Sequence, residues 1–167
     1  MRILHFLPVY LPAWHYGGPV LSVSRLCEGL VSQGVEVRVI TTNAGLPDFP
    51  EALYGSAQII NGVEVFYYQV DQQYGPIRSK HLVDSLANHI IWADLVHLSS
   101  IWQPLGVPVQ NAAHRAGIPD AHRSCLLLSQ LHAKHQGNTL SAGALAISAR
   151  CQPTPKGTLY LSAIPAA

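Results

Sequence analysis

The sequence is short of charged residues, and that shortage excludes several kinds of partner. Charged side chains make up 11% of the 167 residues and the formal net charge is +1, so no broad basic surface is expected that would bind nucleic acid. Apolar runs are short as well, because the longest candidate is interrupted by Asp84, His89, Asp94 and His97. No transmembrane segment is therefore expected, although contact with a membrane surface remains open.

Cysteine is also scarce. The three cysteines, Cys27, Cys125 and Cys151, are an odd number without metal-type spacing, which favours a reduced, cytoplasmic protein. The amino terminus carries one positive charge and its apolar stretch ends at Pro8, so we interpret it as a core strand rather than a secretory signal.

Hydrophobic residues are abundant, at 49%, and enough for one good core. An apolar run from Ile3 to Val9 leads into a loop, Tyr10–Pro19, and apolar residues then recur at helical spacing until Gln33 and Gly34. A second apolar run, Val35–Ile40, completes a β-α-β unit. The pattern predicts an α/β fold with a Rossmann-like, mainly parallel sheet, and it places the loop at the strand ends where ligands bind.

The next hundred residues continue this alternation. Residues 43–54 are rich in proline and glycine and predict an irregular, mobile loop that could close over a ligand, and Asn61-Gly62 predicts a β-hairpin. Ser79 is expected to cap a helix that ends near Trp92. One side of this helix is expected to carry Leu82, Val83, Leu86, Ile90 and Ile91.

A second loop follows a short buried strand, Asp94–Leu98. It spans residues 99–104 and precedes a helix from about Leu105 to Ala116. Because this loop also starts at the carboxyl end of a strand, we expect it to be a neighbour of the Tyr10–Pro19 loop.

The sequence changes character after Pro119. No Asp or Glu occurs beyond Asp120, no strand is predicted where one would normally follow, and Ser129–Arg150 indicates only a weak helix. We therefore divide the chain into a domain of residues 1–119 and a divergent, poorly ordered tail of residues 120–167. One hypothesis is a shifted or interrupted reading frame near codon 119; the alternative is a genuine short protein with a divergent tail.

Four motifs occur in order along residues 1–119. They are Pro8-x-Tyr10-x-Pro12, Gly17-Gly18, Leu30-x-x-x-Gly34-x-Glu36-Val37-x-Val39-x-Thr41, and Ala93-Asp94-Leu95-Val96-His97-Leu98-x-x-Ile101-Trp102. In this order and spacing the chain resembles the N-terminal domain of GT-B glycosyltransferases of family 4.

The resemblance implies an enzyme of two facing Rossmann-like domains. The first mainly holds a carbohydrate or lipid-linked acceptor, and the second mainly holds a nucleotide-diphosphate-sugar donor. The acidic pair that grips the donor belongs to the second domain, so no residue here takes that role. This chain would then be the first half of such an enzyme, truncated and inactive by itself, with no cofactor.

The glycines of the first loop are the leading candidate site residues. Without Cβ atoms, Gly17 and Gly18 would let backbone N–H groups at a helix start approach a diphosphate or an acceptor hydroxyl. The alternative is a simple hinge at the helix entry. The loop lacks the Gly-x-Gly-x-x-Gly pattern of dinucleotide-binding proteins.

The other candidate substrate-binding residues are polar or aromatic. His97 and Ser99 would bind sugar hydroxyls, and Tyr16 and Trp102 would stack against a sugar ring, as Trp14 also could. Each has a structural alternative: a satisfied buried histidine, a turn serine, or an aromatic side chain that closes the core.

Other chemistry lacks support. His132 and His135 have no carboxylate or cysteine nearby at ligand spacing, so no metal site is predicted, and no Gly-x-Ser-x-Gly motif indicates a hydrolase. Two other functions stay open. One is a non-catalytic binding domain that works with a separately encoded donor-binding half, and the other is a small flavodoxin-like regulator, for which the acidic pocket is missing.

Overall fold

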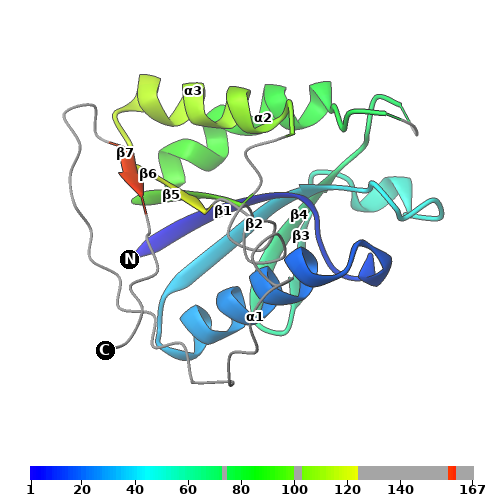
Figure 1. The fold of residues 1–167 in the computed structure, drawn as a ribbon, viewed down its shortest axis with the longest axis horizontal. Coiled ribbons are helices and arrows are strands. Elements are labelled where there is room, and N and C mark those ends of the chain that lie inside the picture. The colour runs from blue at the N-terminus through cyan, green and yellow to red at the C-terminus, as the bar shows by residue number, and fades with distance from the viewer. Residues whose placement is uncertain (73–74, 100–102, 124–157, 161–167) are drawn as a thin grey trace, which may run out of the picture.

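The computed structural model describes residues 1–72, 75–99, 103–123 and 158–160. They form one seven-stranded sheet in the order β3-β4-β2-β1-β5-β6-β7, with helices packed on both faces (Figure 1). Every neighbouring pair of strands is parallel except the antiparallel pair β3 and β4. The predicted α/β, mainly parallel architecture is confirmed.

The first β-α-β unit consists of β1 (Arg2–Val9), α1 (Gly18–Ser32) and β2 (Glu36–Thr42). A short 3-10 helix, η1 (Trp14–Tyr16), precedes α1. Pro19 lies in the first turn of α1, where its missing N–H costs no hydrogen bond. The helix ends where Gly34 takes a φ of 77°, a conformation that glycine adopts without strain. These boundaries agree with the prediction to within two residues.

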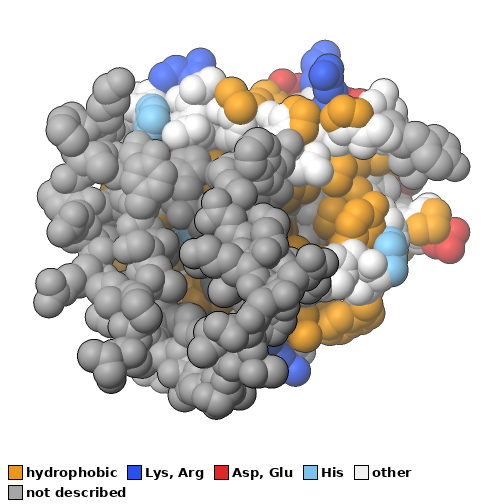
Figure 2. Space-filling model, viewed as in Figure 1, with side chains coloured by type: hydrophobic (Ala, Val, Ile, Leu, Met, Phe, Trp, Pro, Cys, Tyr) orange, Lys and Arg blue, Asp and Glu red, His pale blue; other side chains and the backbone are white. Residues whose placement is uncertain are grey.

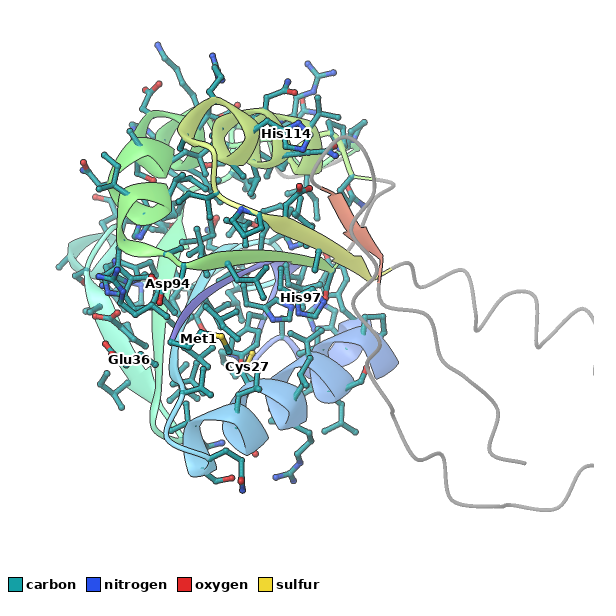
Figure 3. All side chains as sticks on the ribbon, turned by 90° about the vertical axis from the view of Figure 1, so that its left-hand side faces the viewer. Met1, Cys27, Glu36, Asp94, His97 and His114 are labelled. Carbon is teal, nitrogen blue, oxygen red and sulfur yellow. The ribbon has the colours of Figure 1, made fainter. Side chains whose placement is uncertain are left out.

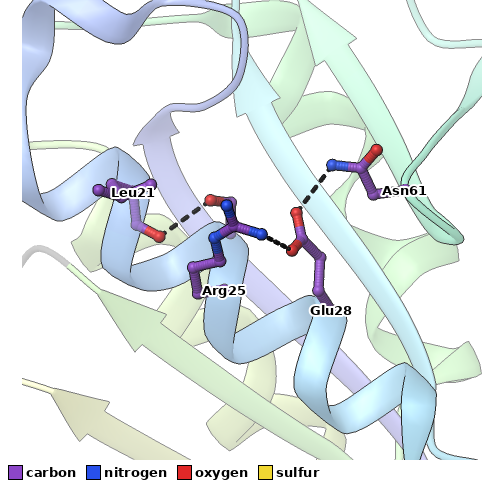
Figure 4. A network of polar contacts seen from close by, with 5 residues as sticks. Leu21, Arg25, Glu28 and Asn61 are labelled. Atoms are coloured by element: carbon purple, nitrogen blue, oxygen red, sulfur yellow. Dashed lines mark hydrogen bonds and ion pairs between the residues drawn. The ribbon is translucent and has the colours of Figure 1, made fainter.

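The predicted hairpin is also present. β3 (Ala57–Ile60) and β4 (Val63–Tyr68) pair in antiparallel fashion across Asn61 and Gly62, whose φ angles are 51° and 82°. Both values suit the type I′ turn that Asn-Gly favours. The hairpin is tied to α1, because the Asn61 side-chain amide donates to Glu28 (2.8 Å) and Arg25 forms an ion pair with the same carboxylate (2.9 Å; Figure 4).

α2 (Lys80–Trp92) is capped as predicted. The Ser79 hydroxyl accepts a hydrogen bond from the Leu82 N–H (3.2 Å), and it donates to the Gln69 carbonyl (2.6 Å). The predicted apolar face is partly wrong, however, because Val83 is 38% exposed and Ile91 is 75% exposed. At about 100° per residue, Ile91 lies roughly opposite Leu82 on the helix surface. The buried residues of this helix are Leu82, Leu86, His89 and Ile90.

β5 (Leu95–Ser99) and α3 (Gly106–Ala116) follow as predicted, and Gly117 ends α3 in the left-handed conformation. The prediction that no strand follows Pro119 is wrong. Asp120–Arg123 forms β6, which pairs with β5, and Thr158–Tyr160 forms β7 beside it. β6 lacks the apolar run that marks a central strand, because one of its residues is a fully buried aspartate, Asp120, that contacts His114 (3.0 Å).

Several features singled out above lie outside the described residues: the tail helix of residues 129–150 with its pair His132 and His135, and the side chains Trp102, Cys125 and Cys151. The predicted division of the chain at residue 119 stays a prediction.

The elements form three layers. α1 covers one face of the sheet, and α2 and α3 lie side by side on the other (Figure 1). Each face has its own core. Leu7, Val23 and Val39 belong to the core under α1, and Leu4, Phe6 and Leu98 belong to the core under α2 and α3. Alternate residues of β1 thus serve opposite layers.

Hydrophobic side chains remain on the outer side of α2 and α3, between Lys and Arg side chains (Figure 2). A groove of about 380 Å³ runs between the two helices and includes Leu86, Ile91 and Ala112 in its lining. None of the helices in the described part of the chain is both long enough and apolar enough to cross a bilayer.

Candidate functional site

The two candidate loops leave neighbouring strands. β1 pairs with β5 in parallel register, with His5 opposite His97, so both strands run toward the same edge of the sheet. The first loop begins at Tyr10, directly after β1, and the second begins after Ser99 at the end of β5. Residues 100–102 of the second loop lie outside the described part. The strand order confirms that these loops start side by side, at the edge where parallel sheets bind ligands.

The first loop is held from the side of β2 and β4. The Tyr67 hydroxyl donates a hydrogen bond to the Leu11 carbonyl, and the Thr42 hydroxyl donates to the Pro8 carbonyl (2.7 Å). Both donors are almost fully buried. Burial also raises the pKa of Tyr67, so its hydroxyl keeps its proton and remains a donor at neutral pH.

The segment of residues 43–54 supports the same loop. It was expected to be irregular, but residues Glu51–Leu53 form a 3-10 helix, η2. The Phe49 ring packs on Tyr54 and Tyr67, with ring centres 5.2 and 4.6 Å apart. Aromatic packing of this kind outweighs the weak local propensity of a sequence rich in proline and glycine.

Gly45 makes a close contact with the first loop. Its φ is 78°, and a Cβ atom built there would lie 2.4 Å from Cε2 of Tyr16 and 2.7 Å from Nε2 of His15. The two rings contact each other, with centres 4.6 Å apart. Glycine adopts this backbone angle without strain, and its missing Cβ leaves room for the two rings where they lie.

Three of the predicted site residues lie on the surface side of this loop. Tyr16 is 45% exposed, and its neighbour Trp14 is 58% exposed. Gly17 takes a φ of 73°, and a Cβ atom at either Gly17 or Gly18 would meet nothing within 4 Å. The backbone at the start of α1 therefore borders open space that a ligand could fill.

His97 and Ser99 are different, because they are buried. Their exposed fractions are 5% and 2%, and they point into the layer between the sheet and α1, where Figure 3 shows His97 and Cys27. The Ser99 hydroxyl is 2.8 Å from Nε2 of His5, whose ring lies 4.3 Å from that of His97. His97 and Ser99 therefore lie beneath the exposed residues of the candidate site.

His5 is the residue that sequence reasoning missed. It is fully buried, yet it stands in an apolar run and was interpreted only as part of a core strand. The available signal was the alternation of side chains along a strand. His5 is separated from Leu7 and Val9 by two and four positions, so all three side chains lie on the face of β1 that α1 covers.

Two buried groups beneath the site, Tyr10 and Cys27, keep their protons at physiological pH. Burial raises the pKa of Cys27 to about 12 and also raises that of Tyr10. No group of three or more His, Cys, Asp or Glu side chains within the described ranges is arranged to hold a metal ion. The site can therefore offer hydrogen bonds, a helix start and aromatic faces, but these groups supply no ionised nucleophile.

Comparison with known proteins assigns the class. The family described as "Glycosyl transferase 4-like domain" matches residues 17–154. This match spans well over half of the sequence, and the chain belongs to that family. The resemblance seen in the sequence motifs is thereby confirmed.

A solved structure of sucrose-phosphate synthase from Thermosynechococcus elongatus is similar, with a TM-score of 0.42 and 15% sequence identity. The similarity covers 72% of this chain but only 32% of that enzyme, so the chain spans about a third of its length. No curated protein sequence matches the chain.

Proposed function

We propose that this chain is the acceptor-side half of a glycosyltransferase that moves a sugar from a nucleotide-diphosphate sugar to a carbohydrate or lipid-linked acceptor. The observation that carries the proposal is the pair of loops that leave adjacent strand ends in a member of the glycosyl transferase 4-like family. Residues 1–119 form the proposed acceptor-side unit, and β6 extends its sheet.

The exposed part of the site would contact the acceptor directly. Tyr16 offers an aromatic face, and Gly17 and Gly18 leave the helix start open to a ligand oxygen. His97 and Ser99 would support the ligand from below, and Trp102 would complete the site from the second loop.

The start of α1 would contribute electrostatically. A helix N-terminus carries roughly half a positive charge, and its first N–H groups have no partner within the helix. Such a group stabilises negative charge that develops on a leaving diphosphate, without a proton transfer. Pro19 has no N–H, and the Gly17 N–H donates to the Trp14 carbonyl (3.0 Å), so the amides of Gly18 and Val20 would carry this role.

Transfer also needs a donor-binding half, and none of the described elements supplies one. We therefore expect negligible transfer by the 167-residue chain alone when it is incubated with UDP-glucose or GDP-mannose and a panel of sugar acceptors. Robust turnover of either donor would overturn this part of the proposal. A cytoplasmic location, with acceptors reached in solution or at a membrane surface, is part of the same proposal.

Gly18→Val tests the acceptor site itself. The valine Cβ has free space, so the variant should still fold, although a β-branched residue before Pro19 costs some stability; its side chain would occupy the space that a ligand needs. We expect binding of a responsive sugar, measured by calorimetry, to weaken at least about tenfold, the equivalent of 1.4 kcal/mol.

Gly29→Val is the matched control, because Gly29 lies on the same helix, is exposed and also has nothing near its Cβ position. It should bind like the unmodified chain. Equal binding by Gly18→Val and Gly29→Val would contradict the proposed acceptor site.

A further inference from the structure

Four buried side chains form a connected set beneath the candidate site. Tyr10 is 1% exposed, Cys27 and His5 are 0% exposed, and Ser99 is 2% exposed. They come from different parts of the fold: Tyr10 starts the first loop, Cys27 belongs to α1, His5 lies in β1, and Ser99 ends β5. Burying polar side chains costs free energy unless they form hydrogen bonds, so these four groups are expected to interact with one another.

The contacts run in one continuous series. The Tyr10 hydroxyl interacts with the Cys27 sulfur, and this interaction adds to the effect of burial in raising the pKa of Tyr10. The sulfur lies 3.7 Å from Nδ1 of His5, and Nε2 of the same ring lies 2.8 Å from the Ser99 hydroxyl. This series, which we term the Tyr10–Ser99 chain, joins the first residue of one candidate loop to the residue that precedes the other.

The protonation of the four groups decides which of them donates and which accepts in each contact. Burial raises the pKa of both Tyr10 and Cys27, so each keeps its proton at neutral pH. The Tyr10 O–H can then donate to the sulfur, and the Cys27 S–H can donate to Nδ1 of His5. A neutral imidazole that accepts at Nδ1 carries its proton at Nε2, and that N–H donates to the Ser99 oxygen.

We propose that the Tyr10–Ser99 chain fixes His5 as the neutral Nε2–H tautomer and thereby turns the Ser99 hydroxyl into a hydrogen-bond donor for a ligand oxygen. His5 is a positioning residue, since it acts through Ser99. The ligand assignment, an oxygen-rich acceptor such as a sugar, rests on the proposed function; the tautomer and the direction of the protons do not.

A purely space-filling role for His5 gives a different expectation. A histidine that only fills the core does not depend on Cys27 for its protonation pattern, so its tautomer should stay the same when Cys27 is replaced. The Tyr10–Ser99 chain requires instead that both ring nitrogens respond to Cys27, and that Nε2 responds to Ser99.

Histidine-labelled protein provides the test. Long-range ¹H–¹⁵N spectra of the full chain with ¹⁵N-histidine distinguish the two neutral tautomers and the charged ring, and His5→Gln identifies the His5 signals. We expect His5 to be neutral, with its proton at Nε2, at pH 7. A charged ring or a proton at Nδ1 would overturn the proposal without affecting the glycosyltransferase assignment.

Variants then test the direction of the series. Cys27→Ala should shift both His5 nitrogens toward a mixture of tautomers, Cys27→Ser should restore the original pattern, and Ser99→Ala should move mainly Nε2. Ser24→Ala is the matched control, because Ser24 is equally buried on α1 but bonds to the Leu21 carbonyl (2.9 Å). If Cys27→Ala and Ser24→Ala leave the His5 signals equally unchanged, the proposal fails.

Discussion

Single residues decide how the site is held, and Gly45 shows this most clearly. Sequence reasoning identified Gly17 and Gly18 because they stand at a helix start, where glycine has a known use. It gave Gly45 no role, because the need for glycine there comes from Tyr16 and His15, which approach from another loop. His5 was missed for a similar reason, since its partner Ser99 lies 94 positions away.

Gly45→Ala should therefore destabilise the protein and displace the rings of the first loop. A left-handed φ costs a non-glycine residue on the order of 1–3 kcal/mol, and the added methyl group would also clash with Tyr16. Urea denaturation measures the change. Gly29→Ala is the control and should be neutral or stabilising by about 0.5–1 kcal/mol, because it replaces an exposed glycine within α1. A loss of stability equal in the two variants would contradict the role given to Gly45.

His89 sets a pH dependence of stability. Burial, with a smaller contribution from Arg38, lowers the pKa of His89 to about 4, and Nε2 of the ring pairs with the Tyr68 hydroxyl (2.6 Å). The unfolded chain has an ordinary histidine pKa near 6.5 and binds the proton more readily. The free energy of unfolding should thus be constant, as far as His89 is concerned, above pH 6.5 and should fall as the pH drops from 6.5 to 4.

The expected loss from His89 is about 3 kcal/mol across this range. His89→Gln keeps a neutral polar side chain that does not titrate, so the difference between the two proteins isolates the contribution of the histidine. Denaturation at several pH values provides the measurement. Parallel pH profiles for the two proteins would show that His89 is not held neutral.

At the scale of elements, local sequence signals predicted most boundaries. The Asn61-Gly62 turn, the Ser79 cap and the stop at Gly117 all appear where expected, because each depends on backbone geometry within a few residues. The failures are non-local. β6 was missed because strand pairing and the contact between His114 and Asp120 stabilise a polar segment, and residues 43–54 gained order from packing on Tyr67.

Ser79→Ala tests the element that is best explained locally. It removes the cap of α2 together with the bond to the Gln69 carbonyl, so stability should fall by about 1 kcal/mol or somewhat more. Ser32→Ala is a suitable control, because the exposed Ser32 hydroxyl bonds only to the Gly29 carbonyl of its own helix (2.7 Å). Equal effects of the two substitutions in urea denaturation would contradict the capping role.

At the scale of the whole molecule, the strand order is what brings the candidate residues together. The alternation of strands and helices predicted the fold class, and the parallel sheet predicted that loops after β1 and β5 would share one edge. The sequence could not show that Tyr16 would lie exposed while His97 and Ser99 lie beneath it. That depth depends on which face of each strand is covered, which in turn depends on the packing of α1.

The central claim is that these two loops form one ligand site, and a residue-resolved titration tests it most directly. Amide ¹H–¹⁵N spectra of the chain would be recorded with increasing amounts of glucose, mannose, maltose and sucrose. We predict that a binding sugar shifts the amides of Gly17, Gly18 and Ser99 together and leaves Ile91 and Ala112, in the α2–α3 groove, unchanged. Shifts confined to that groove, or the absence of any shift at Gly17 and Gly18 with every sugar, would contradict the account.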